Sequence, residues 1–137
     1  MTTENLPAIR ISRRDFARLD HLLATCGGGK LSKGADLLLR ELSRATVMDN
    51  AEIPSDTVTM HTQVLFRDEA SRRERTVTLV YPSERSSGED TLSVLTPLGA
   101  ALIGLSEGQT IEFEGLDGDI RRITVLKVFH RPDEERG

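Results

Sequence analysis

The spacing of apolar residues changes once along this chain, near residue 50. Before that point they recur every three or four residues, as on one face of a helix. After it they alternate, as in strands with one buried face. Residues 49–56, DNAEIPSD, separate the two patterns. The sequence therefore predicts an α+β fold, with a helical unit at residues 1–48, a linker at 49–56 and a sheet domain at 57–137.

The helical unit is expected to be a short antiparallel hairpin. Ser12 precedes an amphipathic run with Asp15 at its third position, which is a shortened capping box. The glycines at 27–29 suit the end of this first helix. A second helix is expected after Ser32, with its apolar face continuing to Ala45. Helices of about 13 and 15 residues reach only ~20 Å and are marginal in isolation, so they must pack on each other.

The second half of the chain predicts a small antiparallel sheet with one short helix. Segments rich in Val, Thr, Ile and Leu are separated by polar loops, and Asp117-Gly118 is a tight hairpin signal. The exception is the run from Pro97 to Gly104, where proline suits the first turn of a helix and glycine suits its end. This run is the most apolar in the chain, yet it is far shorter than the ~20 residues that span a bilayer.

Composition narrows the possible function classes. Cys26 is the only cysteine, which excludes an intrachain disulfide and a cysteine-based zinc site. The N-terminus lacks a hydrophobic signal region, so we expect a cytoplasmic protein without membrane association. Residues 1–50 carry eight basic and six acidic groups, whereas residues 51–137 carry ten and sixteen. Direct sequence-specific binding of nucleic acid is not expected, because duplex binding depends on neutralising phosphates. We expect a monomer.

No combination of residues indicates a metal, a cofactor or a catalytic nucleophile. His21, His61 and His130 lie on separate predicted elements without metal-ligand spacing. Cys26 follows a helix C-terminus, which is the wrong end of the helix dipole for a thiolate. The glycines at 27–29 follow a helix rather than a strand, so they predict a turn and no phosphate loop. We therefore expect no catalytic residue, no metal and no cofactor.

The second half also resembles a known family. The resemblance lies in Thr96-Pro97, in Ala101 to Gly104, in Glu107-Gly108-Gln109 and in the closing strand VLKVF. These features are similar to the C-terminal domain of the bacterial Gre transcript-cleavage factors, which implies an FKBP-like sheet domain. The short hairpin and the stretches DTVTMHTQVLFRD, TLVYPSE and LSVLTPLGAALIGL look closer to the Rnk branch, named regulators of nucleoside diphosphate kinase.

The resemblance implies a non-catalytic regulator that binds RNA polymerase at its secondary channel. Gre factors insert the acidic tip of a longer hairpin there, and its carboxylates help to hold a catalytic magnesium ion. Here residues 25–34 contain no carboxylate, and two lysines would repel a metal. We expect competition with Gre-type factors, an effect on nucleoside diphosphate kinase levels and no transcript cleavage. The tip residues expected at the channel mouth are Gly27, Gly28, Gly29, Lys30, Lys33 and Asp36.

The segment around the Thr-Pro pair is expected, from the same resemblance, to dock on the channel rim. Its residues are Leu95, Thr96, Pro97, Leu98, Gly99 and Ala100. We expect its larger apolar side chains to hold the helix to the sheet while the small residues face outward. The alternative for this helix is core packing without a partner.

Two other functions stay open. An FKBP-like fold suggests peptidyl-prolyl isomerase activity, although four Phe, one Tyr and no Trp can hardly form an aromatic pocket. The branch name suggests direct binding to nucleoside diphosphate kinase.

Overall fold

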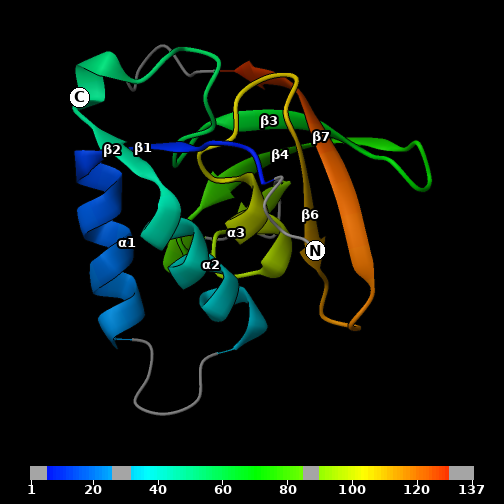
Figure 1. Cartoon of the computed structure of the whole chain (residues 1–137), viewed down its shortest axis with the longest axis horizontal. Coiled ribbons are helices and arrows are strands. Elements are labelled where there is room, and N and C mark those ends of the chain that lie inside the picture. Colours follow the sequence, from blue (N-terminus) through cyan, green and yellow to red (C-terminus); the bar gives the residue numbers. More distant parts are fainter. Residues whose placement is uncertain (1–5, 26–31, 85–89, 130–137) are drawn as a thin grey trace.

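The computed structural model describes residues 6–25, 32–84 and 90–129. These residues form a mixed α+β fold with three α-helices and a curled sheet (Figure 1). In chain order the elements are β1 (Arg10–Ser12), α1 (Arg13–Thr25), α2 (Lys33–Arg44), β2 (Thr46–Met48), η2 (Asn50–Glu52), β3 (Gln63–Asp68), β4 (Glu74–Val80), η3 (Pro82–Glu84), β5 (Thr91–Ser93), α3 (Pro97–Leu102), β6 (Thr110–Glu114) and β7 (Ile120–Phe129).

The first two helices begin where the sequence predicts. The Ser12 hydroxyl accepts a hydrogen bond from the Asp15 backbone N–H at 3.0 Å, and the Ser32 hydroxyl accepts one from Ala35 at 3.1 Å. Each serine thereby satisfies a backbone donor that has no partner within its helix. The second helix is shorter than expected, because Ala45 already has an extended backbone and ends α2 at Arg44.

The antiparallel helical hairpin is not confirmed. In the described residues α2 makes more of its contacts with α3 than with α1. A Cβ added to Gly34 would lie 1.7 Å from the Leu95 carbonyl oxygen, so the α2 backbone rests directly on the chain leading into α3. Leu38, on the same stripe of α2, is fully buried. Helix α2 therefore packs as part of the sheet domain's core, with α1 on its other side (Figure 1).

One hydrophobic core extends across both halves of the chain. It includes Ile11 and Leu19 from the N-terminal part together with Val64 and Leu102 from the C-terminal part. A parallel pair, β1 with β2, links the start of α1 to the end of α2. The division into residues 1–48, 49–56 and 57–137 stays a prediction, and the segment predicted as a linker contains η2.

The main sheet is mixed, so the prediction of an antiparallel sheet is wrong at one edge. Its strand order is β5-β4-β3-β7-β6, and all neighbours are antiparallel except β4 and β5. The connection at 81–90 contains η3 and is too long for a tight hairpin, which allows β5 to return in the direction of β4. The expected hairpin turn at Asp117-Gly118 is confirmed between β6 and β7, with Gly118 at φ 88°.

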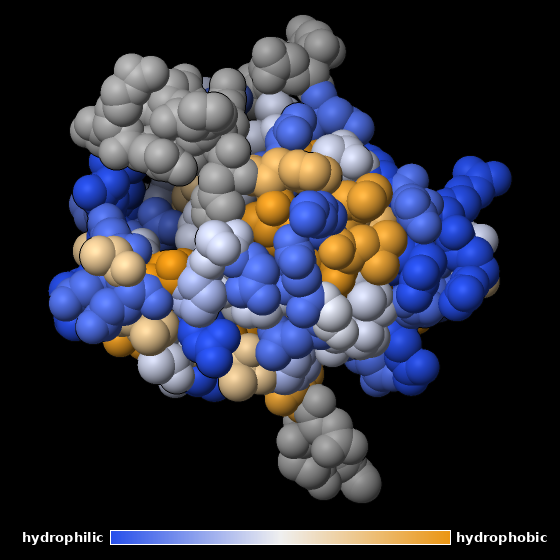
Figure 2. Space-filling model, turned by 90° about the horizontal axis from the view of Figure 1, so that it is seen from above, coloured by the Kyte–Doolittle hydropathy of each residue, from blue (hydrophilic) through white to orange (hydrophobic). Residues whose placement is uncertain are grey.

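Most of the surface seen in Figure 2 is hydrophilic, and the largest apolar patch in this view lies near its centre, bordered by hydrophilic side chains. None of the helices in the described part of the chain is both long enough and apolar enough to cross a membrane.

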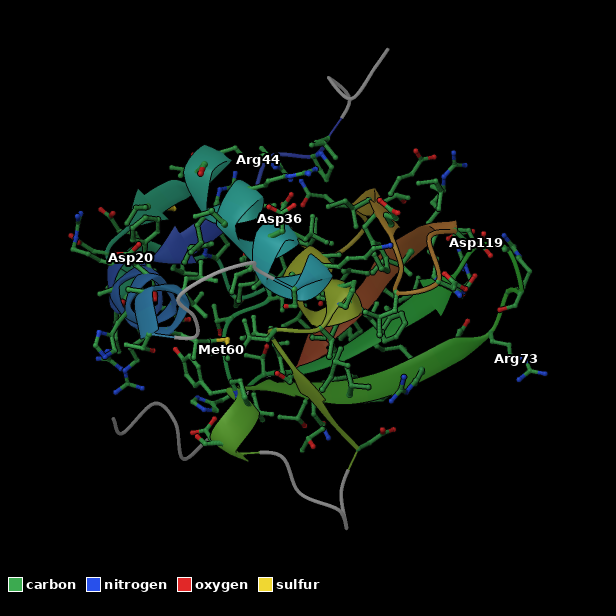
Figure 3. All side chains as sticks on the ribbon, turned by 90° about the horizontal axis from the view of Figure 1, so that it is seen from below. Asp20, Asp36, Arg44, Met60, Arg73 and Asp119 are labelled. Atoms are coloured by element: carbon green, nitrogen blue, oxygen red, sulfur yellow. The ribbon has the colours of Figure 1, made fainter. Side chains whose placement is uncertain are left out.

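A polar cluster fastens α1 to the sheet. An Asp15 carboxylate oxygen accepts a hydrogen bond from the Met60 backbone N–H at 3.2 Å, and Figure 3 shows Met60 close to α1. The next residue, His61, has a positive φ of 71°. Its Nε2 lies 2.8 Å from Glu84 Oε1, which also accepts a hydrogen bond from the Tyr81 backbone N–H at 3.1 Å. Two helical segments and two loops thus meet around these groups.

Burial and hydrogen bonding move the pKa values of these groups in different directions. Burial raises the pKa of Asp15, against the opposing hydrogen bond from Met60. Burial also raises the pKa of Tyr81, to about 12. For Glu84, desolvation would raise the pKa, but the hydrogen bonds from His61 and from the Tyr81 backbone together lower it. Ionised Glu84 therefore stabilises the fold, whereas ionised Asp15 costs stability.

Replacement of Gly34 by alanine should destabilise the protein by about 3 kcal/mol, because the new methyl group would overlap the Leu95 carbonyl group. In an exposed helix the same substitution would stabilise by up to ~1 kcal/mol, so the sign itself is informative. The measurement is urea unfolding. Ser43→Ala on the exposed side of α2 is the control and should change the free energy of unfolding by less than ~0.5 kcal/mol. A stabilised Gly34→Ala variant would contradict the close contact.

Glu84→Gln should flatten the acid side of the stability profile. Because the folded-state pKa of Glu84 lies below its ordinary value of 4.5, its stabilisation is complete above that pH and disappears as the pH falls through the folded-state pKa. The pair with His61 is partly exposed, so the loss at neutral pH should be only ~0.5 kcal/mol. Chemical denaturation at a series of pH values measures both effects.

Asp15→Asn serves as the comparison with the opposite sign. The pKa of Asp15 is raised, so its ionisation costs stability as the pH rises through the folded-state value. The amide oxygen of the variant can still accept the hydrogen bond from the Met60 N–H. The stability of the variant relative to the unaltered protein should therefore be higher at neutral pH than at acid pH. If the free energy of unfolding relative to the unaltered protein changed with pH in the same way for Glu84→Gln and Asp15→Asn, the assignment would be refuted.

Candidate protein-docking surface

The start of α3 is held by a compact set of hydrogen bonds. Thr96 is the N-cap residue, and its hydroxyl accepts from the Gly99 backbone N–H at 3.0 Å while it donates to the Ser93 carbonyl at 2.7 Å. The Leu95 backbone N–H donates to the Ser93 hydroxyl at 3.1 Å. Pro97 occupies the first turn, as the sequence predicts. This segment therefore has a rigid backbone before any partner binds.

The expectation that the small residues of α3 face outward is wrong. Ala100 and Ala101 are both 0% exposed, and Gly99 is buried. A Cβ on Gly99 would lie 2.1 Å from the Ser93 carbonyl oxygen. The small residues allow the chain's own backbone to approach, because α2 and the end of β5 occupy the space that was expected to admit a partner helix.

The accessible part of the predicted docking segment is its N-terminal end. Leu95, Thr96 and Leu98 are partly exposed, whereas Pro97 is buried beside them. Leu102 and Ile103, by contrast, are fully buried and hold α3 to the core as expected. Any direct contact with a partner must therefore use the first turn of α3.

A groove of about 510 Å³ opens beside this first turn. Thr96, Pro97 and Leu98 line it, together with Leu116 from the turn between β6 and β7. Leu116 is 74% exposed. The floor comes from Phe66, Leu92, Phe113 and Ile123. An apolar groove with a leucine at its entrance is suited to binding an apolar side chain.

Charged side chains border the groove. Arg121 donates to Asp117 at 2.7 Å, and Arg75 donates to Asp90 at 3.2 Å. The pKa of Asp117 is lowered, first by the hydrogen bond from the Asp119 backbone N–H and then by Arg121. Arg73 lies at the end of the β3–β4 hairpin, on the side of the molecule opposite Asp20 of α1 (Figure 3).

The predicted hairpin tip is only partly within the described residues. Gly27, Gly28, Gly29 and Lys30 lie outside them. Lys33 Nζ lies 3.1 Å from Glu114 Oε2 and 3.5 Å from the Gly115 carbonyl oxygen. Asp36 forms the helical ion pair with Arg40 at 3.0 Å.

The residues at the C-terminal end of the predicted tip lie against the predicted docking segment. Gly34 directly follows Lys33 and contacts Leu95 and Thr96. The structure thus places two of the regions selected from the sequence side by side. It adds two that sequence reasoning missed, Leu116 and the floor of the groove. The Asp-Gly turn signal locates Leu116 on a hairpin, but nothing in the sequence shows which part of the fold that hairpin adjoins.

Of the residues considered as metal ligands or nucleophiles, those that the structure describes form structural contacts or are exposed. His61 pairs with Glu84, His21 is exposed, and Cys26 and His130 lie outside the described residues. Asp117-Gly118-Asp119 forms a hairpin turn. In residues 6–25, 32–84 and 90–129, no group of three or more His, Cys, Asp or Glu side chains is placed to hold a metal ion.

Two family models match this chain. The model described as "Transcription elongation factor, GreA/GreB, C-term" matches residues 53–129, and the model described as "Rnk N-terminus" matches residues 7–48. The chain is 38% identical over 127 residues to "Regulator of nucleoside diphosphate kinase" of Escherichia coli K12, covering 93% of each protein. It is 37% identical over 91 residues to "Transcription elongation factor GreA" of Chloroherpeton thalassium, covering 66% of this chain and 57% of that protein.

A solved structure supports the same relationship. The "Prokaryotic transcription elongation factor GreA/GreB from Nitrosomonas europaea" has a TM-score of 0.69 and 40% identity, covering 90% of this chain and 99% of that one. The fold is therefore GreA/GreB-like, and the FKBP-like description is not confirmed. The related proteins are named as regulators or elongation factors. From its N-terminal and C-terminal matches together, the chain belongs to the GreA/GreB transcription elongation factor family and carries the Rnk type of N-terminus.

Proposed function

We propose that this protein is a non-enzymatic, cytoplasmic transcription regulator that binds RNA polymerase as a monomer at the rim of the secondary channel. One observation carries the proposal: the start of α2 and the chain leading into α3 touch each other, through Gly34 and Leu95. A single partner surface can therefore contact both. Family membership supports a transcription-related partner.

The docking contact is assigned to the first turn of α3 and the adjacent groove. Leu95, Thr96 and Leu98 supply accessible side chains, and Leu116 extends the apolar surface of the groove. The shape of the turn is fixed by three buried residues, Pro97, Gly99 and Ala100. Exposed apolar side chains that adjoin a groove and are bordered by polar residues are typical of protein interaction sites.

The tip is assigned to the channel mouth without a catalytic role. In this proposal, Gly27, Gly28, Gly29 and Lys30 are assigned to the channel mouth, with Lys33 and Asp36 beside them. A magnesium ion requires oxygen ligands, and residues 25–34 carry none as carboxylates. The proposed effect is competition with Gre-type factors for the same entrance. An altered level of nucleoside diphosphate kinase would then be an indirect consequence of transcription.

Leu116→Asp should weaken binding to core RNA polymerase at least tenfold, because it puts a charge at the entrance of an apolar groove. Leu116 is 74% exposed, so the free energy of unfolding should change by less than ~0.5 kcal/mol. Leu39→Asp is the matched control, since Leu39 is 42% exposed on the outer side of α2. Fluorescence anisotropy of labelled protein measures the affinity. Unchanged binding by folded Leu116→Asp would refute the docking assignment.

Purified protein should fail to stimulate transcript cleavage in a stalled elongation complex. With a Gre factor present, increasing amounts should inhibit the cleavage which that factor stimulates, and Leu116→Asp should inhibit less. The length of the RNA product on a gel reports both effects. Cleavage stimulated by this protein alone would overturn the non-catalytic assignment, and absence of inhibition at saturating binding would overturn the competition.

A further inference from the structure

Strand β6 forms one edge of the main sheet. Among the described strands it pairs with β7 only, in an antiparallel register, so none of them covers its outer side. The Gly115 N–H donates to the Asp119 carbonyl at 2.9 Å, and the Val125 N–H donates to the Gln109 carbonyl at 3.0 Å. Odd-numbered residues of this strand therefore hydrogen-bond to β7. Hydrogen-bonded and non-hydrogen-bonded residue pairs alternate along two antiparallel strands. The backbone groups of the even-numbered residues are therefore directed away from β7.

Three residues consequently present free backbone groups along this edge. They are Thr110, Glu112 and Glu114, and within the described parts of the chain their backbone N–H and C=O groups have no hydrogen-bond partner. An unpaired row of this kind is a template for another strand.

A groove of suitable size runs along the open edge. Its volume is about 670 Å³, and residues of both β6 and α2 line it. Ile111, Phe113 and Leu37 line it together with charged side chains, which include Lys33, Asp36, Arg40, Glu41, Arg44 and Arg122. Five residues of extended chain measure ~17 Å, which matches the length of β6. The groove therefore offers backbone hydrogen bonds at β6 and a lining in which apolar side chains lie among charged ones.

We propose that the open edge of β6 binds an extended segment of a partner protein as an added strand. In such a strand, alternate side chains share the two faces of β6. The outer row of β6 is Thr110, Glu112 and Glu114, and these are exposed. The inner row of β6 consists of Ile111 and Phe113, which belong to the lining of the groove. The chemistry that fits is a segment with basic side chains facing out and aliphatic side chains facing in.

The charges of the edge favour such a partner over a second copy of this chain. Antiparallel pairing of two β6 strands would bring acidic residues opposite each other, and like charges in cross-strand pairs are destabilising. Glu112 already pairs with Arg122, and Glu114 pairs with Lys33 at 3.1 Å. Both pairs are about half exposed, so each contributes little and can be exchanged for a basic side chain of the partner. This inference does not depend on the proposed polymerase binding.

The test uses a change that removes an edge donor while it leaves the pairing with β7 intact. Because the Glu112 N–H is directed away from β7, Glu112→Pro removes no backbone hydrogen bond of the fold, and proline is tolerated at such edge positions. It does remove the side-chain pair with Arg122. The preceding Ile111 is already extended, as proline requires. Glu112→Thr is the matched control, which removes the charge and keeps the N–H. The probe is an acetylated and amidated hexapeptide of alternating lysine and valine.

Amide hydrogen exchange measured by NMR gives the result for the unaltered protein. At saturating peptide, exchange at Thr110, Glu112 and Glu114 should slow at least tenfold. Glu112→Pro should abolish peptide binding, and Glu112→Thr should weaken it by a smaller factor. A hexapeptide of alternating glutamate and valine should not bind.

Three outcomes would overturn the proposal. The first is absence of slowed exchange at the three amides, which would leave the glutamates as charged guards of an unused edge. The second is equal binding by folded Glu112→Pro. The third is slowed exchange that depends on protein concentration without peptide, which would show pairing between copies. The exchange measurement needs no variant, so it decides the question even if Glu112→Pro fails to fold.

Discussion

The close contact between Gly34 and the Leu95 carbonyl group organises this molecule. A helix can lie on a neighbouring backbone at this distance only where it has no side chain. The contact holds the start of α2 against the chain that leads into α3, and it brings Leu38 onto the core. As a result, the two short helices obtain from the sheet domain the packing that they lack as an isolated pair.

The same contact explains why the small residues around α3 do not form a partner surface. Gly99 and Ala100 allow close approach of the backbone of β5 and of the neighbouring helix. They are therefore buried and not accessible to a partner. What is left for recognition is the first turn of α3, whose shape depends on the Thr96 cap and on Pro97. A substitution in the buried part would act on the fold first, whereas the exposed Leu116 separates recognition from stability.

The features that sequence predicts correctly are encoded locally. Ser12 and Ser32 each cap a helix within three residues, Pro97 lies in the first turn of α3, and Asp117-Gly118 forms its turn within a single hairpin. The features that sequence does not reveal depend on contacts between distant segments. The parallel course of β5 and the packing of α2 on α3 have no short-range signal. The same is true of the groove, whose lining residues are separated in the chain and meet only through the sheet.

The first turn of α2 connects the two surfaces of this protein. Lys33 contacts Glu114 at the end of the open edge of β6, and Gly34 contacts the entry to α3 beside the apolar groove. Both surfaces therefore lie at the base of the segment that joins α1 to α2. The contacts differ in strength, because an exposed ion pair contributes little whereas a tight backbone contact tolerates almost no displacement. A strand added at β6 can thus displace the Lys33 side chain without moving α2, which leaves the groove beside α3 in place for a second partner.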